Sequence, residues 1–187
     1  MKKLTSFVLL AILFASISIS VSSCKKDDPV MAAPTLTLYD SLGGTTMVAD
    51  PKASGTMIEK GRLGIRSVVD STIFVIAADS RINGYFQTLL TEVGSGNLSG
   101  FTALSKTLTD FLCVGTGAKN FTYSGKSMVA AHDPAQNSRM KMKADNAAMD
   151  AFIADVVVGA NKNALPNYLI ARVGAVLESL RTQVVQR

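Results

Sequence analysis

Apolar residues recur at steps of three and four along much of the chain, a spacing that predicts amphipathic helices. The most regular stripe lies in residues 101–112 and consists of Phe101, Leu104, Leu108, Phe111 and Leu112. Residues 62–78 carry a second stripe, whose β-branched side chains leave a strand as the alternative on propensity alone. Both stretches are predicted to be helices.

Two longer amphipathic stretches, 145–161 and 166–186, predict two further helices near the C-terminus. The first is expected to bury Met149, Phe152, Val156 and Val157, and the second Leu169, Val173, Val176, Leu177 and Leu180. Short helices are predicted at 38–42, before a glycine pair, and at 127–132, before Asp133-Pro134.

The segment between the first two predicted helices has no apolar stripe. Residues 45–60 hold Pro51, Gly55 and several Ser and Thr, which predict a loop. No pair of strands brackets an Asn-Gly or Asp-Gly turn, the usual hairpin signal. The predicted fold class is therefore all-α.

The first residues have the pattern of a targeting segment. Lys2 and Lys3 precede an apolar run at 7–21 that is short for a membrane span. Val21-Ser22-Ser23-Cys24 resembles a lipobox, so residues 1–23 are predicted to be a lipoprotein signal peptide. The lipidated Cys24 would then anchor the mature protein to a membrane without spanning it.

The predicted mature chain begins with a tether, residues 24–37, and continues as one domain, residues 38–187. Lys25-Lys26-Asp27-Asp28 resembles the export tag of surface lipoproteins in some Gram-negative lineages, although a solvated spacer is the alternative. The predicted location is the outer membrane, facing the periplasm or the cell surface.

Charge and cysteine content exclude several functions. The net charge of +5 falls to +3 without Lys2 and Lys3, and the basic residues are scattered, so no nucleic-acid partner is expected. Cys113 has no second cysteine to pair with once Cys24 is lipidated, and it is predicted to be a small buried apolar residue.

The chain contains one histidine, His132. Imidazole is a good nitrogen ligand for a metal or a heme iron, so any such site that uses histidine must use this one. On a helix, the carbonyl of Met128 lies one turn before His132 and would hold the second ring nitrogen.

The order of these signals resembles that of the truncated hemoglobins. Leu38-Tyr39-x-x-Leu42-Gly43-Gly44 is similar to the family's opening helix and first glycine stop, and Tyr85-Phe86 to its Phe-Phe pair. Thr109-Asp110-Phe111-Leu112, followed by Gly115-Thr116-Gly117, is similar to the distal helix and second stop. Tyr123-Ser124-Gly125 and Met128-x-x-x-His132 are similar to the turn and proximal helix.

The resemblance implies a two-over-two helical globin around heme b. It assigns His132 as the proximal ligand of the iron and places six further residues in the heme pocket: Phe86, Leu104, Leu108, Met128, Tyr123 and Ile73. Ile73 occupies the position where the first group of the family usually has a distal tyrosine, with Thr72 before it. Because Leu104 and Leu108 replace common polar residues as well, the pocket is predicted to be unusually apolar.

The function that follows is reversible binding of a diatomic gas: oxygen, nitric oxide or carbon monoxide. Without a distal hydrogen-bond donor, fast oxygen release and easy oxidation of the iron are expected, unless Thr72 or a polar residue from 45–60 enters the pocket. The alternatives are nitric oxide dioxygenase or peroxidase chemistry, which needs a separate reductase, and a heme-free interaction lipoprotein.

Overall fold

The helices predicted from the apolar stripes are present in the computed structural model, which describes residues 35–187. The helices are α1 (Leu38–Ser41), α2 (Lys60–Ala78), η1 (Asn83–Phe86), α3 (Gln87–Gly94), α4 (Ser99–Gly115), α5 (Met128–His132), α6 (Asn146–Lys162), α7 (Asn167–Glu178) and α8 (Arg181–Val184). Two short strands, β1 (Met47–Ala49) and β2 (Met57–Glu59), precede α2. The predicted signal peptide, Cys24 and the tether up to residue 34 lie outside the described residues.

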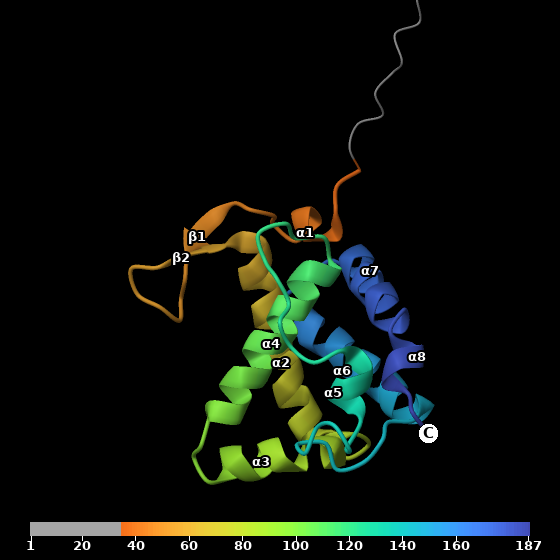
Figure 1. Ribbon diagram of the computed structural model, residues 1–187. Helices are drawn as coiled ribbons and strands as arrows, with labels where there is room; N and C mark the ends of the chain where they lie inside the picture. Colours follow the sequence, from red (N-terminus) through yellow and green to blue (C-terminus); the bar gives the residue numbers. More distant parts are fainter. Residues whose placement is uncertain (1–34) are drawn as a thin grey trace, which may run out of the picture. The chain divides into compact units, whose positions relative to one another are not determined.

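The long helices pack as two pairs. α2 lies against α4, α6 lies against α7, and the largest contact in the domain joins α2 of one pair to α6 of the other. Figure 1 shows α2, α4 and α6 crossing at the centre, with α7 and α8 along one side. The apolar stripe of each helix faces this centre, which confirms the all-α prediction and helix over strand for 62–78.

The prediction of a loop at 45–60 is wrong, because β1 and β2 form an antiparallel hairpin with Val48 opposite Ile58. Long-range ion pairs fix its tip, which sequence periodicity does not reveal. Arg66 of α2 donates to both carboxylate oxygens of Asp50, at 3.0 and 2.7 Å, and lowers the pKa of Asp50 to about 2. Lys52 pairs with Asp70 at 2.5 Å.

The single helix predicted at 166–186 is divided into α7 and α8. The amide of Leu180 donates to the carbonyl of Leu177, three residues back, which tightens the backbone where α7 ends. Arg181 then binds Glu178 and, on α6, Asp150. The predicted burial of Val157 is also wrong: it is 36% exposed, because it lies about 100° around α6 from the buried Val156.

No helix within residues 35–187 combines the length and the apolar composition that crossing a membrane requires.

A buried carboxyl group on α6 lies close to the residues that follow α2. The side chain of Asp155 is 3% exposed, and its Oδ1 is 3.8 Å from Nη2 of Arg81. Its Oδ2 has no hydrogen-bond partner in the described part of the chain. Burial, together with the negative charge of Asp79, raises the pKa of Asp155 to about 6.

We therefore expect Asp155→Asn to stabilise the protein above about pH 6, by about 3 kcal/mol. Between about pH 4 and pH 6 the carboxyl group of Asp155 is protonated in the folded state but ionised in the unfolded chain. The stability of the parent therefore falls as the pH rises through that window. Urea unfolding at about pH 4 and about pH 7.5 measures the effect. Equal stability differences between the two proteins at both pH values would contradict it.

Candidate functional site

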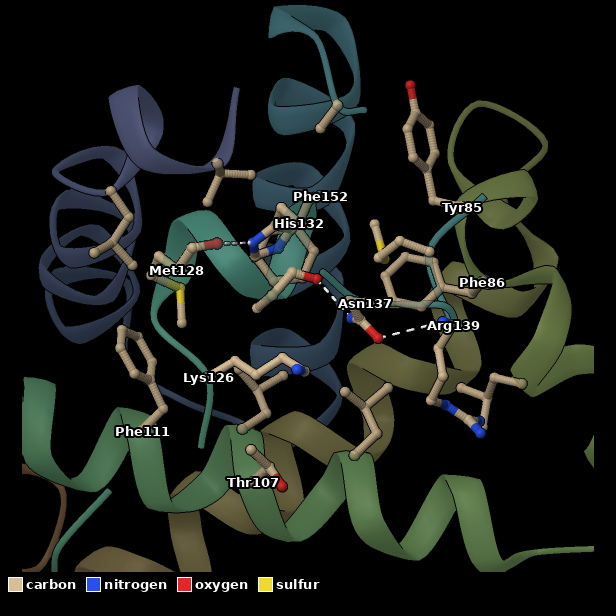
Figure 2. A pocket seen from close by; sticks show the side chains of 18 of the residues that line it. Tyr85, Phe86, Thr107, Phe111, Lys126, Met128, His132, Asn137, Arg139 and Phe152 are labelled. Atoms are coloured by element: carbon tan, nitrogen blue, oxygen red, sulfur yellow. Dashed lines mark hydrogen bonds between the residues drawn. The ribbon is translucent and has the colours of Figure 1, made fainter. Parts of the chain in front are cut away.

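A largely apolar cavity of about 380 Å³ lies between α4, α5 and α6. Its size is in the usual range for a small-molecule or cofactor site. The side chains in Figure 2 enter it from several elements: Phe111 and Thr107 from α4, Met128 and His132 from α5, and Phe152 from α6. Phe86 lies on the opposite side of the cavity from Met128. The arrangement is an apolar slot with an imidazole in its wall.

His132 is held in one orientation by its own helix. Its Nδ1 is 2.8 Å from the carbonyl oxygen of Met128, which can only accept, so Nδ1–H donates. In the neutral imidazole this tautomer leaves the lone pair on Nε2. This is the hydrogen bond expected from the sequence. A neutral imidazole oriented in this way presents one nitrogen to a metal ion or a ligand.

The short helix α5 is fixed at both ends. Ser127 Oγ accepts a hydrogen bond from the amide of Ala130 at 3.2 Å and caps the first turn. At the other end Asn137 Nδ2 donates to the carbonyl of Ala131 at 2.6 Å. Gln186, after α8, donates to the carbonyl of Val129 at 2.8 Å. These bonds position His132 although α5 has only five residues.

The α4 wall of the cavity contains Leu104, Leu108 and Phe111, all partly buried. Thr107 lies on the same helix at the exposed rim. Phe111 meets the ring of Tyr123 edge to face, with centroids 5.2 Å apart. The hydroxyl of Tyr123 donates to the carbonyl of Lys126 at 2.6 Å, which closes the turn before α5.

Six of the seven predicted pocket residues line this cavity: Phe86, Leu104, Leu108, Tyr123, Met128 and His132. Ile73 does not, since it is 5% exposed and packs within the core. Thr72 is also outside the cavity, and its hydroxyl donates to the carbonyl of Val68. No residue of the hairpin at 45–60 lines it. The cavity wall is therefore largely apolar, and Ile73 is not part of it.

Several lining residues were not assigned to the site from the sequence. Met149 and Phe152 were expected in the core, and periodicity alone could not show that α6 faces a cavity. Asn137, Arg139 and Met140 come from the loop after His132, where no periodic pattern exists. Lys126 directly precedes the cap of α5, a position that could have drawn attention to it.

The mouth of the cavity carries positive charge. Lys126 is exposed, lines the cavity, and makes no ion pair with a carboxylate of residues 35–187. Arg139 instead binds Glu92 through two hydrogen bonds of 2.8 and 2.6 Å. That pairing lowers the pKa of Glu92 and raises that of Arg139. Among the lining residues within 35–187, Lys126 is thus the cation that remains available to an anionic group in the cavity.

Comparison with known proteins supports the fold. No protein-family model and no curated relative matches the chain. Among solved structures, it is similar to the truncated hemoglobin of Tetrahymena pyriformis in its Fe(III) form and to two single mutants of that protein. Each likeness has 22% identity and a TM-score of 0.58, and covers 81% of this chain and 100% of the other. The chain therefore has a truncated-globin fold, as predicted.

Proposed function

We propose that this protein is a heme-binding globin that reversibly binds a diatomic gas, oxygen or nitric oxide, with His132 as the proximal ligand of the iron. The observation that carries the proposal is the hydrogen bond from Nδ1–H of His132, the only histidine, to the carbonyl of Met128. In the neutral ring this bond leaves the lone pair of Nε2 free to coordinate iron from the cavity wall. Proximal imidazoles need such an acceptor to fix the ring and to increase its basicity.

The other lining residues fit heme b by their chemistry. A porphyrin is a flat apolar ring with two carboxylates at one edge, and it needs an apolar slot with a cation at the mouth. Phe86, Leu104, Leu108 and Met128 supply apolar surface. Lys126 supplies the cation, since Arg139 is already bound to Glu92.

Heme held by one imidazole supplies an iron that binds oxygen, nitric oxide or carbon monoxide when it is ferrous. The chain's own contribution is to exclude water and to offer few hydrogen-bond donors to the gas. Because Leu104 and Leu108 occupy the α4 wall and Thr107 is at the rim, we infer weak retention of oxygen. Nitric oxide dioxygenase or peroxidase chemistry, which needs a separate reductase, remains the alternative predicted from the sequence.

The absorption spectrum of the full chain with added hemin tests the proposal. The parent protein is expected to show a strong heme band and to bind carbon monoxide after reduction. His132→Ala is expected to shift or lose that band, because the one strong nitrogen donor is removed. Met142→Ala is a matched control, since this exposed side chain is not among those lining the cavity. If the parent protein shows no heme band, the proposal is wrong, and the globin fold of this protein serves another role.

We further propose that the protein is anchored to the outer membrane as a lipoprotein through Cys24. The support is the lipobox-like sequence that ends at Cys24 and the charged residues that follow it. Labelling with a radioactive fatty acid tests this part, and label that persists in a Cys24→Ser protein would exclude the assignment.

A further inference from the structure

The loop that joins α5 to α6 crosses one side of the cavity. We call residues 133–143 the strap. It begins directly after His132, and three of its residues, Asn137, Arg139 and Met140, line the cavity. Figure 2 places Asn137 and Arg139 on the side of Phe86, away from Met128 and Phe111. The strap therefore closes the part of the cavity that α4 and α5 leave open.

One ion pair fastens the strap to α3. Arg139 donates to both carboxylate oxygens of Glu92 on α3, at 2.8 and 2.6 Å, and Thr88 of α3 donates to the carbonyl of Arg139 at 3.3 Å. A bidentate arginine–carboxylate pair fixes the relative orientation of the two side chains and is stronger than a single hydrogen bond. The fastening joins two segments that are 47 residues apart in the sequence.

The surrounding structure makes room for this pair. Gly100 is in the first turn of α4, and a Cβ there would collide with both the Glu92 carboxylate and the Arg139 guanidinium. Three elements, α3, α4 and the strap, thus meet at one ion pair. We call this ion pair, which joins the strap to α3 beside the start of α4, the latch.

The latch can open without unfolding of the core. The side chains of Arg139 and Glu92 are 47% and 24% exposed, and Ser138, Lys141, Met142 and Lys143 are exposed as well. Segments with few buried contacts open locally at low free-energy cost. By contrast, α4 and α6 on the other sides of the cavity are packed into the core.

We propose that the strap is the gate through which the flat, carboxylate-bearing ligand enters and leaves the cavity, and that the Glu92–Arg139 pair is its latch. This inference rests on the proposed function, in which the ligand is heme. Arg139 is a positioning residue in this arrangement: it holds the strap closed, and Lys126 remains the cation for the ligand carboxylates.

The test is the rate at which the hemin-loaded full chain gives up hemin to excess apomyoglobin. Glu92→Gln and Arg139→Gln are each expected to raise that rate by about 2- to 5-fold, the upper part of the range for exposed ion pairs. The double replacement Glu92→Arg with Arg139→Glu is expected to restore a slow rate. Added salt is expected to speed hemin loss more in the parent than in Glu92→Gln or Arg139→Gln, because only the parent still has the Glu92–Arg139 pair for salt to screen.

The matched control is Glu178→Gln, which breaks a similar two-pronged pair with Arg181 at 2.6 and 2.7 Å, away from the strap. Its hemin loss is expected to equal that of the parent. Far-UV circular dichroism and thermal unfolding check that each variant is folded. Hemin loss that is unchanged in both latch variants, or equally fast in the control, would overturn the gate. A parent that binds no hemin would overturn the proposed function itself.

Discussion

Leu108→Gln is expected to slow oxygen release from the reduced, hemin-loaded protein by roughly 10- to 100-fold. Leu108 lies on α4 and lines the cavity opposite α5, which carries His132. A glutamine there places an amide donor where the gas ligand would lie. Bound oxygen carries partial negative charge, and a hydrogen bond to a charged acceptor is worth about 1.5–3 kcal/mol.

Stopped-flow displacement of oxygen measures this rate. Leu108→Met is the matched control, because it keeps an apolar side chain of similar size. Carbon monoxide depends less on a donor, so its release is expected to change little in either variant. An equal effect of Gln and Met on oxygen release would show that shape, and not the missing donor, sets the rate.

The sequence predicted the elements that depend on periodicity and on local geometry. The apolar stripe at 101–112 lies on α4, as predicted. Helical spacing alone predicted the hydrogen bond between the imidazole of His132 and the carbonyl of Met128. Both follow from distances within one helix, which are set by a rise of 1.5 Å and 3.6 residues per turn. The truncated-globin fold was implied by the resemblance of the order of these signals to a known family, whereas the residues alone predicted only an all-α fold.

Features that depend on distant partners could not be predicted. An ion pair between Asp50 and Arg66 holds the hairpin at 45–60 against α2. An ion pair between Glu92 and Arg139 holds the strap against α3. Neither pair has a spacing that a local pattern would detect. Their effects are still large, since one keeps the hairpin against α2 and the other closes the cavity beside Phe86.

Ile73 illustrates a different limit. Alignment by motif placed it at the distal position, and the side chain is apolar and buried as expected, but it packs into the core and not into the cavity. A helix position fixes which way a residue points relative to its own axis. It does not fix how close that helix lies to the slot, which depends on the packing of α2 against α4 and α6.

Gly159→Ala is expected to lower the free energy of unfolding by about 3 kcal/mol, the upper range for overpacking. Gly159 is buried on α6 at its contact with α2. A Cβ there would clash with the hydroxyl of Thr72 and would lie 3.0 Å from the Thr72 amide nitrogen and 3.1 Å from its Cα. The last two atoms belong to the backbone of a packed helix, so relief requires the two helices to separate.

The destabilisation expected for Gly159→Ala is opposite in sign to the intrinsic helix propensities of the two residues. Alanine in place of glycine stabilises an unconstrained helix by about 1 kcal/mol. Gly174 in α7 is the matched control, because nothing lies within 4 Å of a Cβ built on it. Gly174→Ala is therefore expected to stabilise the protein by about 0.5–1 kcal/mol. Urea unfolding of both variants measures the difference.

The spacing of α2 and α6 also connects stability to the cavity. α6 carries Ala148, Met149 and Phe152 into the cavity wall, so a shift of this helix changes the slot that His132 faces. Gly159→Ala is expected to weaken hemin retention together with stability. Adding Thr72→Ala removes the hydroxyl but not the backbone clash, so it should restore only part of the loss, with a coupling of about 1 kcal/mol. Full restoration, or a Gly159→Ala protein as stable as Gly174→Ala, would show that the backbones of α2 and α6 can separate at little cost.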